Sequence, residues 1–212
     1  PIAHIEAGVR TGNTDSPEEI NRKLCDHLAT INFSPTILSY HNLKREGLSD
    51  SRNYFCGDVM FDMVLNTRFK KPNIRLPDKY VLATIHRQEN TDSKEVLNDI
   101  FLNLISLSAT INILLPMHPR TKKKLKEIKL YEKVINSLNV LEPQSYNSLL
   151  YLIKHSEIVI SDSGGIPKEA AFLGKPSIYI GNKIIWYELY DQNWSYLLTP
   201  SNANSLLQTY NL

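Results

Sequence analysis

Titratable or small polar residues follow four of the apolar runs in this sequence, at the point where each run ends. Glu6 follows PIAHI, His86 and Arg87 follow YVLATI, His118 follows INILLPM, and residues 162–165 follow EIVIS. If these runs are parallel strands, their carboxyl ends meet at one edge of a sheet, where open α/β sheets bind their ligands. Carboxylates and imidazoles gathered there could act as general acids and bases.

The stretch SDSGGIPKEA, residues 161–170, joins an apolar run to a helix-forming run. Ser163 offers a hydroxyl, and Gly164 and Gly165 let the backbone approach a ligand with no Cβ in the way. The amides that open the following helix could then bind an anion, and Glu169 could accept hydrogen bonds from ribose hydroxyls. The pattern is neither GxGxxG nor a P-loop. A tight strand-to-helix turn therefore remains an alternative to a phosphate site.

Each of these residues also has a structural explanation when it is taken alone, since a single Glu or His at a strand end is more often a turn or capping residue. In SPEEI, Ser16 fits an N-cap, Pro17 fits the first helical position, and Glu19 completes a capping box. Glu18 is likewise favoured at a helix N-terminus for its charge alone. The apolar residues that follow fall on one face: Ile20, Leu24, Leu28 and Ile31.

Short apolar runs alternate with helical patterns along the whole chain, and most runs lack polar alternation, as buried parallel strands do. The predicted strands are 1–6, 31–34, 53–57, 80–86, 111–118, 139–142, 157–162 and 176–181. The predicted helices lie near 17–30, 36–46, 58–68, 93–108, 119–129, 145–155, 164–173 and 202–210. This alternation predicts a doubly wound, parallel α/β fold.

The polar, proline-containing stretch from 67 to 79 has little periodicity and is the best candidate for a linker. We therefore expect a first part over residues 1–68, a linker over 69–79 and a larger second part over 80–212. The chain opens with PIAHIEAG rather than Met, which reads as the end of a strand inside a domain.

The bulk properties exclude several classes of partner. The chain has 212 residues, 42% of them hydrophobic, and a net charge of +2, which is too small to predict binding to nucleic acid or to a membrane. The basic segment 120–129 is interpreted as a solvated helix face. No apolar run reaches the roughly 18 residues of a membrane span. Cys25 and Cys56 have no metal-binding spacing, so we expect reduced thiols in a cytoplasmic protein.

Several stretches together resemble the non-hydrolysing UDP-N-acetylglucosamine 2-epimerases. They are HIEAGVRTGN (4–13), SPEEINRKLCDHLATINFSPT (16–36), GDVMFDMV (57–64), TIHRQENTD (84–92), PMHPRT (116–121) and EPQSYNSLLYLIKHSEIVISDSGGIPKEAAFLGKPSI (142–178). The resemblance covers residues 1 to about 180, in order. Beyond it, GNKIIWYELYDQ shares only Glu188 with the segment that is usual in the family. The family's first lobe normally begins well before HIEAG, and its last helices extend beyond QTYNL.

The resemblance implies a two-lobed, Rossmann-like arrangement of the GT-B type, with the first lobe incomplete here. It implies epimerisation at C2 of UDP-N-acetylglucosamine to give UDP-N-acetylmannosamine, a precursor of cell-surface polysaccharide. UDP is eliminated to leave a 2-acetamidoglucal and is then added back. No metal or other cofactor is implied, and a homodimer is expected. The isolated chain is expected to be weakly active or inactive.

The same resemblance implies roles for particular residues. Glu6 and Glu18 match the catalytic carboxylates and His86 the essential histidine. A base is needed because the C2 proton is only weakly acidic, and donors must stabilise the departing UDP. The substrate-binding residues implied are His118 at the nucleotide, Ser163, Gly164 and Gly165 at the diphosphate, and Glu169 at the ribose. Arg87 matches a position near the cleft, where it would contact the substrate or an activating second UDP-sugar.

Two other functions remain open at this point. A GT-B glycosyltransferase would share the fold and the Gly-Gly turn, although it need not combine Glu6, Glu18 and His86. A UDP-sugar-binding fragment without catalysis would bind UDP and would not convert the UDP-sugar. A metallohydrolase is disfavoured, because the six histidines show no HExxH spacing. The sugar itself, N-acetylglucosamine or a diacetamido uronic acid, is not determined by the sequence.

Overall fold

The computed structural model describes residues 1–13, 16–200 and 206–210. Its internal contacts divide the chain into two compact units, Pro1–Asn66 and Thr67–Leu212. Residues 67–79 contain no helix or strand and belong to the second unit.

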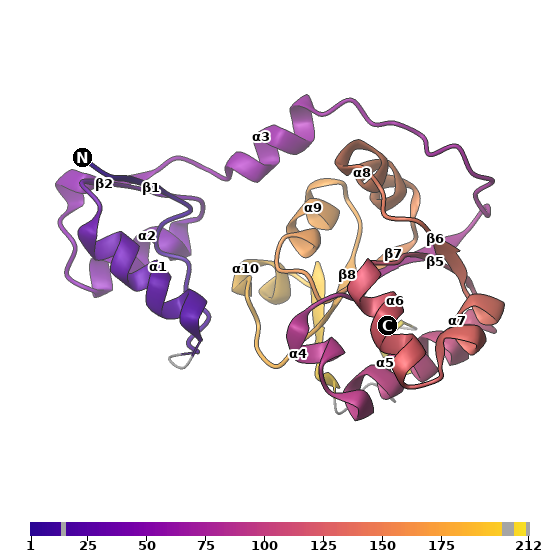
Figure 1. Cartoon of the computed structure of the whole chain (residues 1–212). Coiled ribbons are helices and arrows are strands. Elements are labelled where there is room, and N and C mark those ends of the chain that lie inside the picture. The colour runs from indigo at the N-terminus through magenta and orange to yellow at the C-terminus, as the bar shows by residue number, and fades with distance from the viewer. Residues whose placement is uncertain (14–15, 201–205, 211–212) are drawn as a thin grey trace. The chain divides into compact units, whose positions relative to one another are not determined.

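The first unit is a parallel sheet with helices between its strands (Figure 1). The strands β1 (Ala3–Ile5), β2 (Ile31–Ser34) and β3 (Asn53–Phe55) pair in the order β1-β2-β3. Helices α1 (Pro17–Leu28) and α2 (Ile37–Arg45), a 3₁₀ turn (Asp50–Arg52) and α3 (Val59–Asn66) connect and follow them. Parallel neighbours of this kind need crossover connections, which α1 and α2 supply.

The second unit is a larger parallel sheet in the order β6-β5-β4-β7-β8-β9. Its strands are β4 (Tyr80–Thr84), β5 (Asn112–Pro116), β6 (Asn139–Leu141), β7 (Ile158–Ser161), β8 (Ser177–Ile180) and β9 (Ser195–Leu198). The helices are α4 (Gln88–Thr91), α5 (Lys94–Ser108), α6 (Pro119–Glu127), α7 (Tyr131–Ser137), α8 (Tyr146–His155), α9 (Ile166–Phe172), α10 (Tyr187–Asp191) and α11 (Leu206–Tyr210). The strand order reverses between β4 and β7, which is the position where doubly wound sheets bind ligands.

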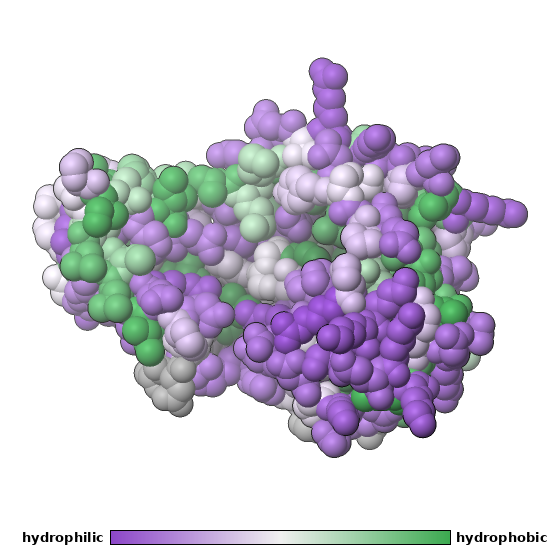
Figure 2. Space-filling view, in the orientation of Figure 1, coloured by the Kyte–Doolittle hydropathy of each residue, from purple (hydrophilic) through white to green (hydrophobic). Residues whose placement is uncertain are grey.

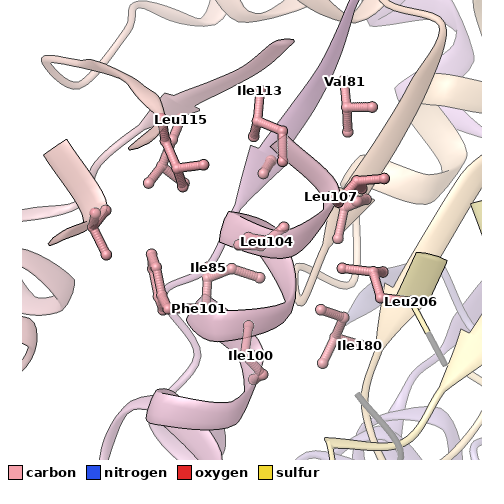
Figure 3. Packing of buried hydrophobic residues seen from close by; sticks show 14 of the residues in the cluster. Val81, Ile85, Ile100, Phe101, Leu104, Leu107, Ile113, Leu115, Ile180 and Leu206 are labelled. Atoms are coloured by element: carbon pink, nitrogen blue, oxygen red, sulfur yellow. The ribbon is translucent and has the colours of Figure 1, made fainter. Parts of the chain in front are cut away.

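The core of the second unit lies under α5. Phe101, Leu104 and Leu107 from α5 pack on Val81 and Ile113 from β4 and β5, and all five are fully buried or nearly so (Figure 3). Strands β4 and β7 are buried along their whole length, which explains why their sequences show no polar alternation. Helix α9 contacts α8 and α10, away from α5, so both faces of the sheet are covered (Figure 1).

All eight predicted strands are present, and the α/β class is confirmed by the parallel pairing. The structure adds β9 and the short helices α4, α7 and α10, which the sequence did not predict. Short helices offer too few turns for a 3.6-residue period to stand out. The helix predicted over 202–210 is seen as α11 from Leu206, and residues 202–205 lie outside the described part of the chain.

The predicted capping box at the start of α1 is wrong. Ser16 is the N-cap residue, but its side chain makes no capping hydrogen bond and its hydroxyl instead donates to Glu18. Glu19 is 1% exposed and accepts hydrogen bonds from the backbone of Thr11 and Gly12. The carboxylate therefore holds the preceding loop rather than the end of its own helix.

Helix α1 presents its predicted apolar face to the surface of the first unit. Ile20, Leu24 and Leu28 are 47%, 55% and 71% exposed, and Figure 2 shows apolar side chains on the surface of this unit. The buried residues of α1 are two carboxylates, Glu19 and Asp26. In this unit α1 is therefore oriented by polar contacts, and its apolar stripe is not part of the core.

Helix α6 carries the basic segment, and its lysines are exposed or half-buried, as predicted for a solvated face. Among the helices of the described residues, none is both long and apolar enough to cross a membrane.

Candidate functional site

The carboxyl ends of β4 and β7 are joined by one buried carboxylate, that of Asp162. Asp162 is fully buried and accepts hydrogen bonds from the backbone amides of His86 and Arg87, at 3.0 and 2.8 Å. The side-chain amide of Asn90 donates a further bond to the same carboxylate, at 3.1 Å. Hydrogen bonds to the charged form are the condition under which a buried carboxylate is tolerated. Asp162 thereby fixes the loop that carries His86.

The imidazole of His86 lies at this edge with 41% of its side chain exposed, and its Nδ1 is 3.7 Å from Asp162 Oδ1. The ring of His118 is its neighbour, with centroids 5.9 Å apart. His118 begins α6 as its N-cap, and its Nδ1 accepts the backbone amide of Arg120 at 3.1 Å. An accepting Nδ1 places the proton of a neutral imidazole on Nε2. The structure thus brings together the ends of β4 and β5, each with one histidine.

Arg87 is directed along the sheet edge toward β8. Its guanidinium NH1 donates to the hydroxyl of Tyr179 at 2.8 Å and lies 3.9 Å from Glu89. Burial raises the pKa of Tyr179, and the neighbouring Arg87 opposes that rise. Arg87 therefore carries a positive charge at the same edge as His86, beside β7 and β8.

The Gly-Gly turn follows strand β7, which pairs with β4. The amide of Ser163 donates to the hydroxyl of Ser161 at 3.0 Å, and Ser161 in turn contacts Thr84 of β4 at 2.7 Å. Gly165 is the N-cap of α9. At Gly164 a Cβ would meet its nearest atom, Ile185 Cδ1, at an ordinary contact of 3.4 Å, so the protein alone does not require glycine there.

Trp186 covers the same turn from the segment between β8 and α10. Its indole NH donates to the carbonyl of Gly164 at 2.7 Å, and the ammonium of Lys168 sits 3.9 Å from the centre of its ring. Gly164, Ile185 and Trp186 line one pocket together with Tyr179. The segment that departs from the family pattern therefore packs on the Gly-Gly turn.

Glu169 lies within α9 and is 6% exposed. Burial raises the pKa of its carboxyl above 4.5, while a hydrogen bond from Tyr146 and the charge of Lys168 oppose that rise. Burial and the nearby Glu169 raise the pKa of the Tyr146 hydroxyl to about 12. The Tyr146 hydroxyl therefore keeps its proton in the neutral range and can donate it in the hydrogen bond to Glu169.

Glu6 and Glu18 belong to the first unit. Glu6 directly follows β1 and has a φ of +70°, which an L-residue rarely adopts. Glu18 is exposed in the first turn of α1. The half-buried Glu6 lies in a loop that is bound to α1 by the carboxylates of Asp26 and Glu19.

The site residues predicted in the second unit fall into two groups. His86, Arg87, His118, Ser163 and Gly164 lie at the ends of adjacent strands, whereas Glu169 faces Tyr146 of α8. The sequence did not identify the polar residues that hold these groups in place: Tyr146, Asn90, Tyr179, Lys168 and Trp186. Their partners are distant in the chain, so no local pattern marks them. Asp162 could be identified from the sequence as a candidate, because it directly follows a predicted strand.

No group of three or more His, Cys, Asp or Glu side chains that could hold a metal ion occurs among the described residues. The candidate residues offer carboxylates in the first unit, and imidazoles, a guanidinium and backbone amides in the second.

The chain is similar to proteins that are named as epimerases. A family model described as UDP-N-acetylglucosamine 2-epimerase matches residues 1–212. A Methanococcus maripaludis protein named UDP-N-acetylglucosamine 2-epimerase homolog is 40% identical over 98% of this chain and 60% of its own length. A Pseudomonas aeruginosa protein named UDP-2,3-diacetamido-2,3-dideoxy-D-glucuronate 2-epimerase is 39% identical over 89% of this chain and 54% of its own length.

The crystal structure of a Methanocaldococcus jannaschii UDP-GlcNAc 2-epimerase, in complex with UDP-GlcNAc and UDP, is similar with a TM-score of 0.89 and 34% identity. The similarity covers 99% of this chain and 61% of that one. The chain thus spans 60%, 54% and 61% of the lengths of these three relatives, in the order given. Since the family model matches all of its residues, the chain belongs to the UDP-N-acetylglucosamine 2-epimerase family.

Proposed function

We propose that this chain carries the catalytic carboxylates and the nucleotide site of an enzyme that epimerises a UDP-N-acetylhexosamine at C2. The observation that carries the proposal is the binding of the His86 amide by Asp162, beside Ser163, Gly164 and Gly165, at the point where the strand order reverses. A crystal structure that contains UDP-GlcNAc and UDP belongs to a protein similar over 99% of this chain.

The reaction needs a base, an acid and a stabilised leaving group. In the proposed path the C2–H bond breaks as a base takes the proton, and the C1–O bond breaks as UDP leaves with the bonding electrons. UDP then adds back to C1 of the unsaturated sugar, and C2 receives a proton on its other face. We assign the proton transfers to Glu6 and Glu18, which are carboxylates in the first unit.

The second unit is proposed to hold UDP. His86 would assist departure of the diphosphate, and the backbone at Ser163, Gly164 and Gly165 would donate to its oxygens. Arg87 places a positive charge at the same edge, which favours departure of the diphosphate as it gains negative charge. His118 would contact the nucleotide, and Glu169, oriented by Tyr146, would accept from the ribose.

A second substrate has a specific observation in its favour. The Pseudomonas aeruginosa relative, named for a diacetamido glucuronate, is as similar as the first relative, at 39% against 40% identity. In this chain the segment over the Gly-Gly turn contains Ile185 and Trp186 with Lys168 against the indole. We therefore propose testing the UDP derivatives of both sugars, with N-acetylglucosamine as the first choice.

The family also supports two proposals about the protein in the cell. We propose that it acts in the cytoplasm as a homodimer. Cys25 and Cys56 are free thiols in the structure, which suits a reducing compartment. Sedimentation equilibrium of the purified protein measures the oligomeric state directly.

The deciding experiment is proton NMR of UDP-N-acetylglucosamine in D₂O. The complete gene product that contains this chain is measured first, and residues 1–212 alone second. We expect loss of the C2 proton signal and the appearance of the manno isomer with the complete product. Residues 1–212 are expected to bind UDP and to exchange more slowly.

Three results are informative. Exchange with no acceptor sugar present excludes a glycosyltransferase as the explanation of the fold. Exchange of only the diacetamido uronate derivative assigns the second substrate. UDP binding without exchange of either sugar, in the complete product, would overturn the proposed epimerisation and leave a UDP-sugar-binding protein.

A further inference from the structure

The turn that carries Glu6 is held in an unfavourable backbone conformation. Glu6 has a φ of +70° and Gly8 a φ of +80°. A left-handed conformation is unfavourable for a non-glycine residue, so the surrounding structure must supply contacts that keep it. At Gly8 no other residue fits, since a Cβ would lie 2.1 Å from the carbonyl oxygen of Ser39.

The principal contacts come from one side chain, Asp26. It is fully buried in α1, and its two carboxylate oxygens reach both flanks of the turn. Oδ1 lies 2.6 Å from Nδ1 of His4, two residues before Glu6. Oδ2 accepts the backbone amide of Gly8, two residues after Glu6, at 3.1 Å.

Three further side chains, those of Arg10, Glu46 and Asn42, complete this arrangement. Arg10 NH2 lies 2.7 Å from Asp26 Oδ2, and the same guanidinium is bound by Glu46 through two bonds of 2.7 and 2.6 Å. Asn42 donates to the carbonyl of Gly8 at 2.9 Å. Asp26 thus has an ion pair and two hydrogen-bond partners, which is what a buried carboxylate requires.

Helix α1 binds the same loop a second time, about two helical turns nearer its N-terminus. There Glu19 accepts from Thr11 and Gly12. Residues 19 and 26 lie on one face of the helix, opposite in character to its exposed apolar stripe. The buried face of α1 therefore serves to hold the loop that follows β1.

We infer that Asp26 is a positioning residue for Glu6: its carboxylate holds His4 and Gly8 so that the intervening Glu6 keeps the conformation needed for proton transfer at C2. The inference rests on the proposed function for the role of Glu6, and on the geometry alone for the clamp itself. It does not place Asp26 in contact with substrate.

The first arm of the test does not depend on activity. Amide hydrogen exchange at Gly8 is measured by NMR in the wild type, Asp26→Asn and the control Asp50→Asn. Asp50 is an exposed aspartate of the same unit, paired with Lys44 at 3.0 Å. We expect the Gly8 amide to exchange at least about tenfold faster in Asp26→Asn, and the control to match the wild type. Unchanged Gly8 protection in Asp26→Asn would overturn the inference.

The second arm measures C2 proton exchange in D₂O. We expect Asp26→Asn to lower kcat about 10- to 100-fold with KM within about threefold, as for an interaction made in the transition state. In a Glu6→Gln background the same change should cost less than about twofold, because the residue it positions is already disabled. Equal losses in both backgrounds would show that Asp26 acts independently of Glu6 and would overturn the inference.

If Asp26→Asn does not fold, the same contact is tested through its other partner, His4. His4→Ala removes the bond to Asp26 and is expected to lower kcat, whereas His4→Asn restores a donor near Nδ1 and should recover most of the loss. If the wild type shows no C2 exchange, the proposed function fails, and the Gly8 amide still decides whether Asp26 holds the turn.

Discussion

The carboxylate of Asp162, at the end of β7, accepts the backbone amide of His86, at the end of the neighbouring strand β4. Both carboxylate oxygens lie 3.0 Å from that nitrogen, and the side chain of Asp162 is fully buried. In the register of the two strands, Thr84 lies opposite Ser161. His86 comes two residues after Thr84, and Asp162 comes directly after Ser161. One side chain therefore sets both the start of the His86 loop and the start of the Gly-Gly turn.

Replacing Asp162 with Asn should destabilise both the loop that carries His86 and the Gly-Gly turn. An amide offers one acceptor where the carboxylate serves three donors, and its NH₂ group would face the amides of His86 and Arg87. We expect a loss of about 2–4 kcal/mol in the free energy of unfolding and a loss of at least about tenfold in UDP affinity. Urea unfolding and UDP titration calorimetry measure the two effects.

The matched control is Asp92→Asn. Asp92 is an aspartate with several partners too, in its case the cations Arg120 at 2.7 Å and Lys124 at 3.4 Å, but its side chain is 43% exposed. Surface ion pairs contribute about 0–1 kcal/mol, so this variant should remain close to the wild type. Equal stability of the two variants would show that the buried bonds of Asp162 are not important for the fold.

The sequence predicted the parallel α/β class and every strand except β9, because uninterrupted apolar runs such as residues 80–86 are typical of doubly covered strands. It also predicted which residues lie at the ends of β4, β5 and β7. It did not predict Tyr146 or Trp186, whose partners Glu169 and Gly164 are 23 and 22 positions away. The capping box at Ser16 failed for a related reason, since a tertiary contact to Thr11 took the carboxylate that the local motif assigns to the helix end.

Glu169 should make stability depend on pH with a definite sign. Burial raises the pKa of its carboxyl above 4.5, so between 4.5 and that higher value the folded state binds the proton more tightly than the unfolded state. Stability therefore falls as pH rises through this window. We expect Glu169→Gln to match the wild type near pH 4 and to be more stable at pH 7, as measured by thermal unfolding across pH.

Glu95→Gln is the control, because the pKa of Glu95 is shifted in the opposite direction to that of Glu169. The pKa of Glu95 is lowered by its own backbone amide and by a hydrogen bond from Ser93, so replacing it should give no gain in stability at pH 7. A gain at neutral pH in both variants would reflect the loss of one negative charge from the protein rather than the burial of Glu169.

Glu6→Gln should remove proton transfer while sparing the nucleotide. Glutamine keeps the size of the side chain but cannot take a proton, and general acid–base groups contribute about 10²- to 10⁴-fold to rates. We expect C2 exchange to fall by at least about 100-fold, with UDP affinity within about threefold, because the proposed UDP site lies in the other unit. Exchange at a near wild-type rate would show that Glu6 is not the base or the acid.

Trp186 should report binding at the Gly-Gly turn by its fluorescence. The chain has two tryptophans, and Trp194→Phe leaves Trp186 as the single tryptophan, 8% exposed and bonded to the Gly164 carbonyl. Excitation near the red edge of the absorption band then selects its emission over that of the tyrosines. We expect UDP to change the emission of this variant in a saturable manner. Trp186→Phe, which loses the 2.7 Å bond to Gly164, should bind UDP about three- to tenfold more weakly, since a neutral hydrogen bond contributes about 0.5–1.5 kcal/mol. Unchanged emission in Trp194→Phe with calorimetric binding intact would mean that UDP does not occupy the turn beneath Trp186.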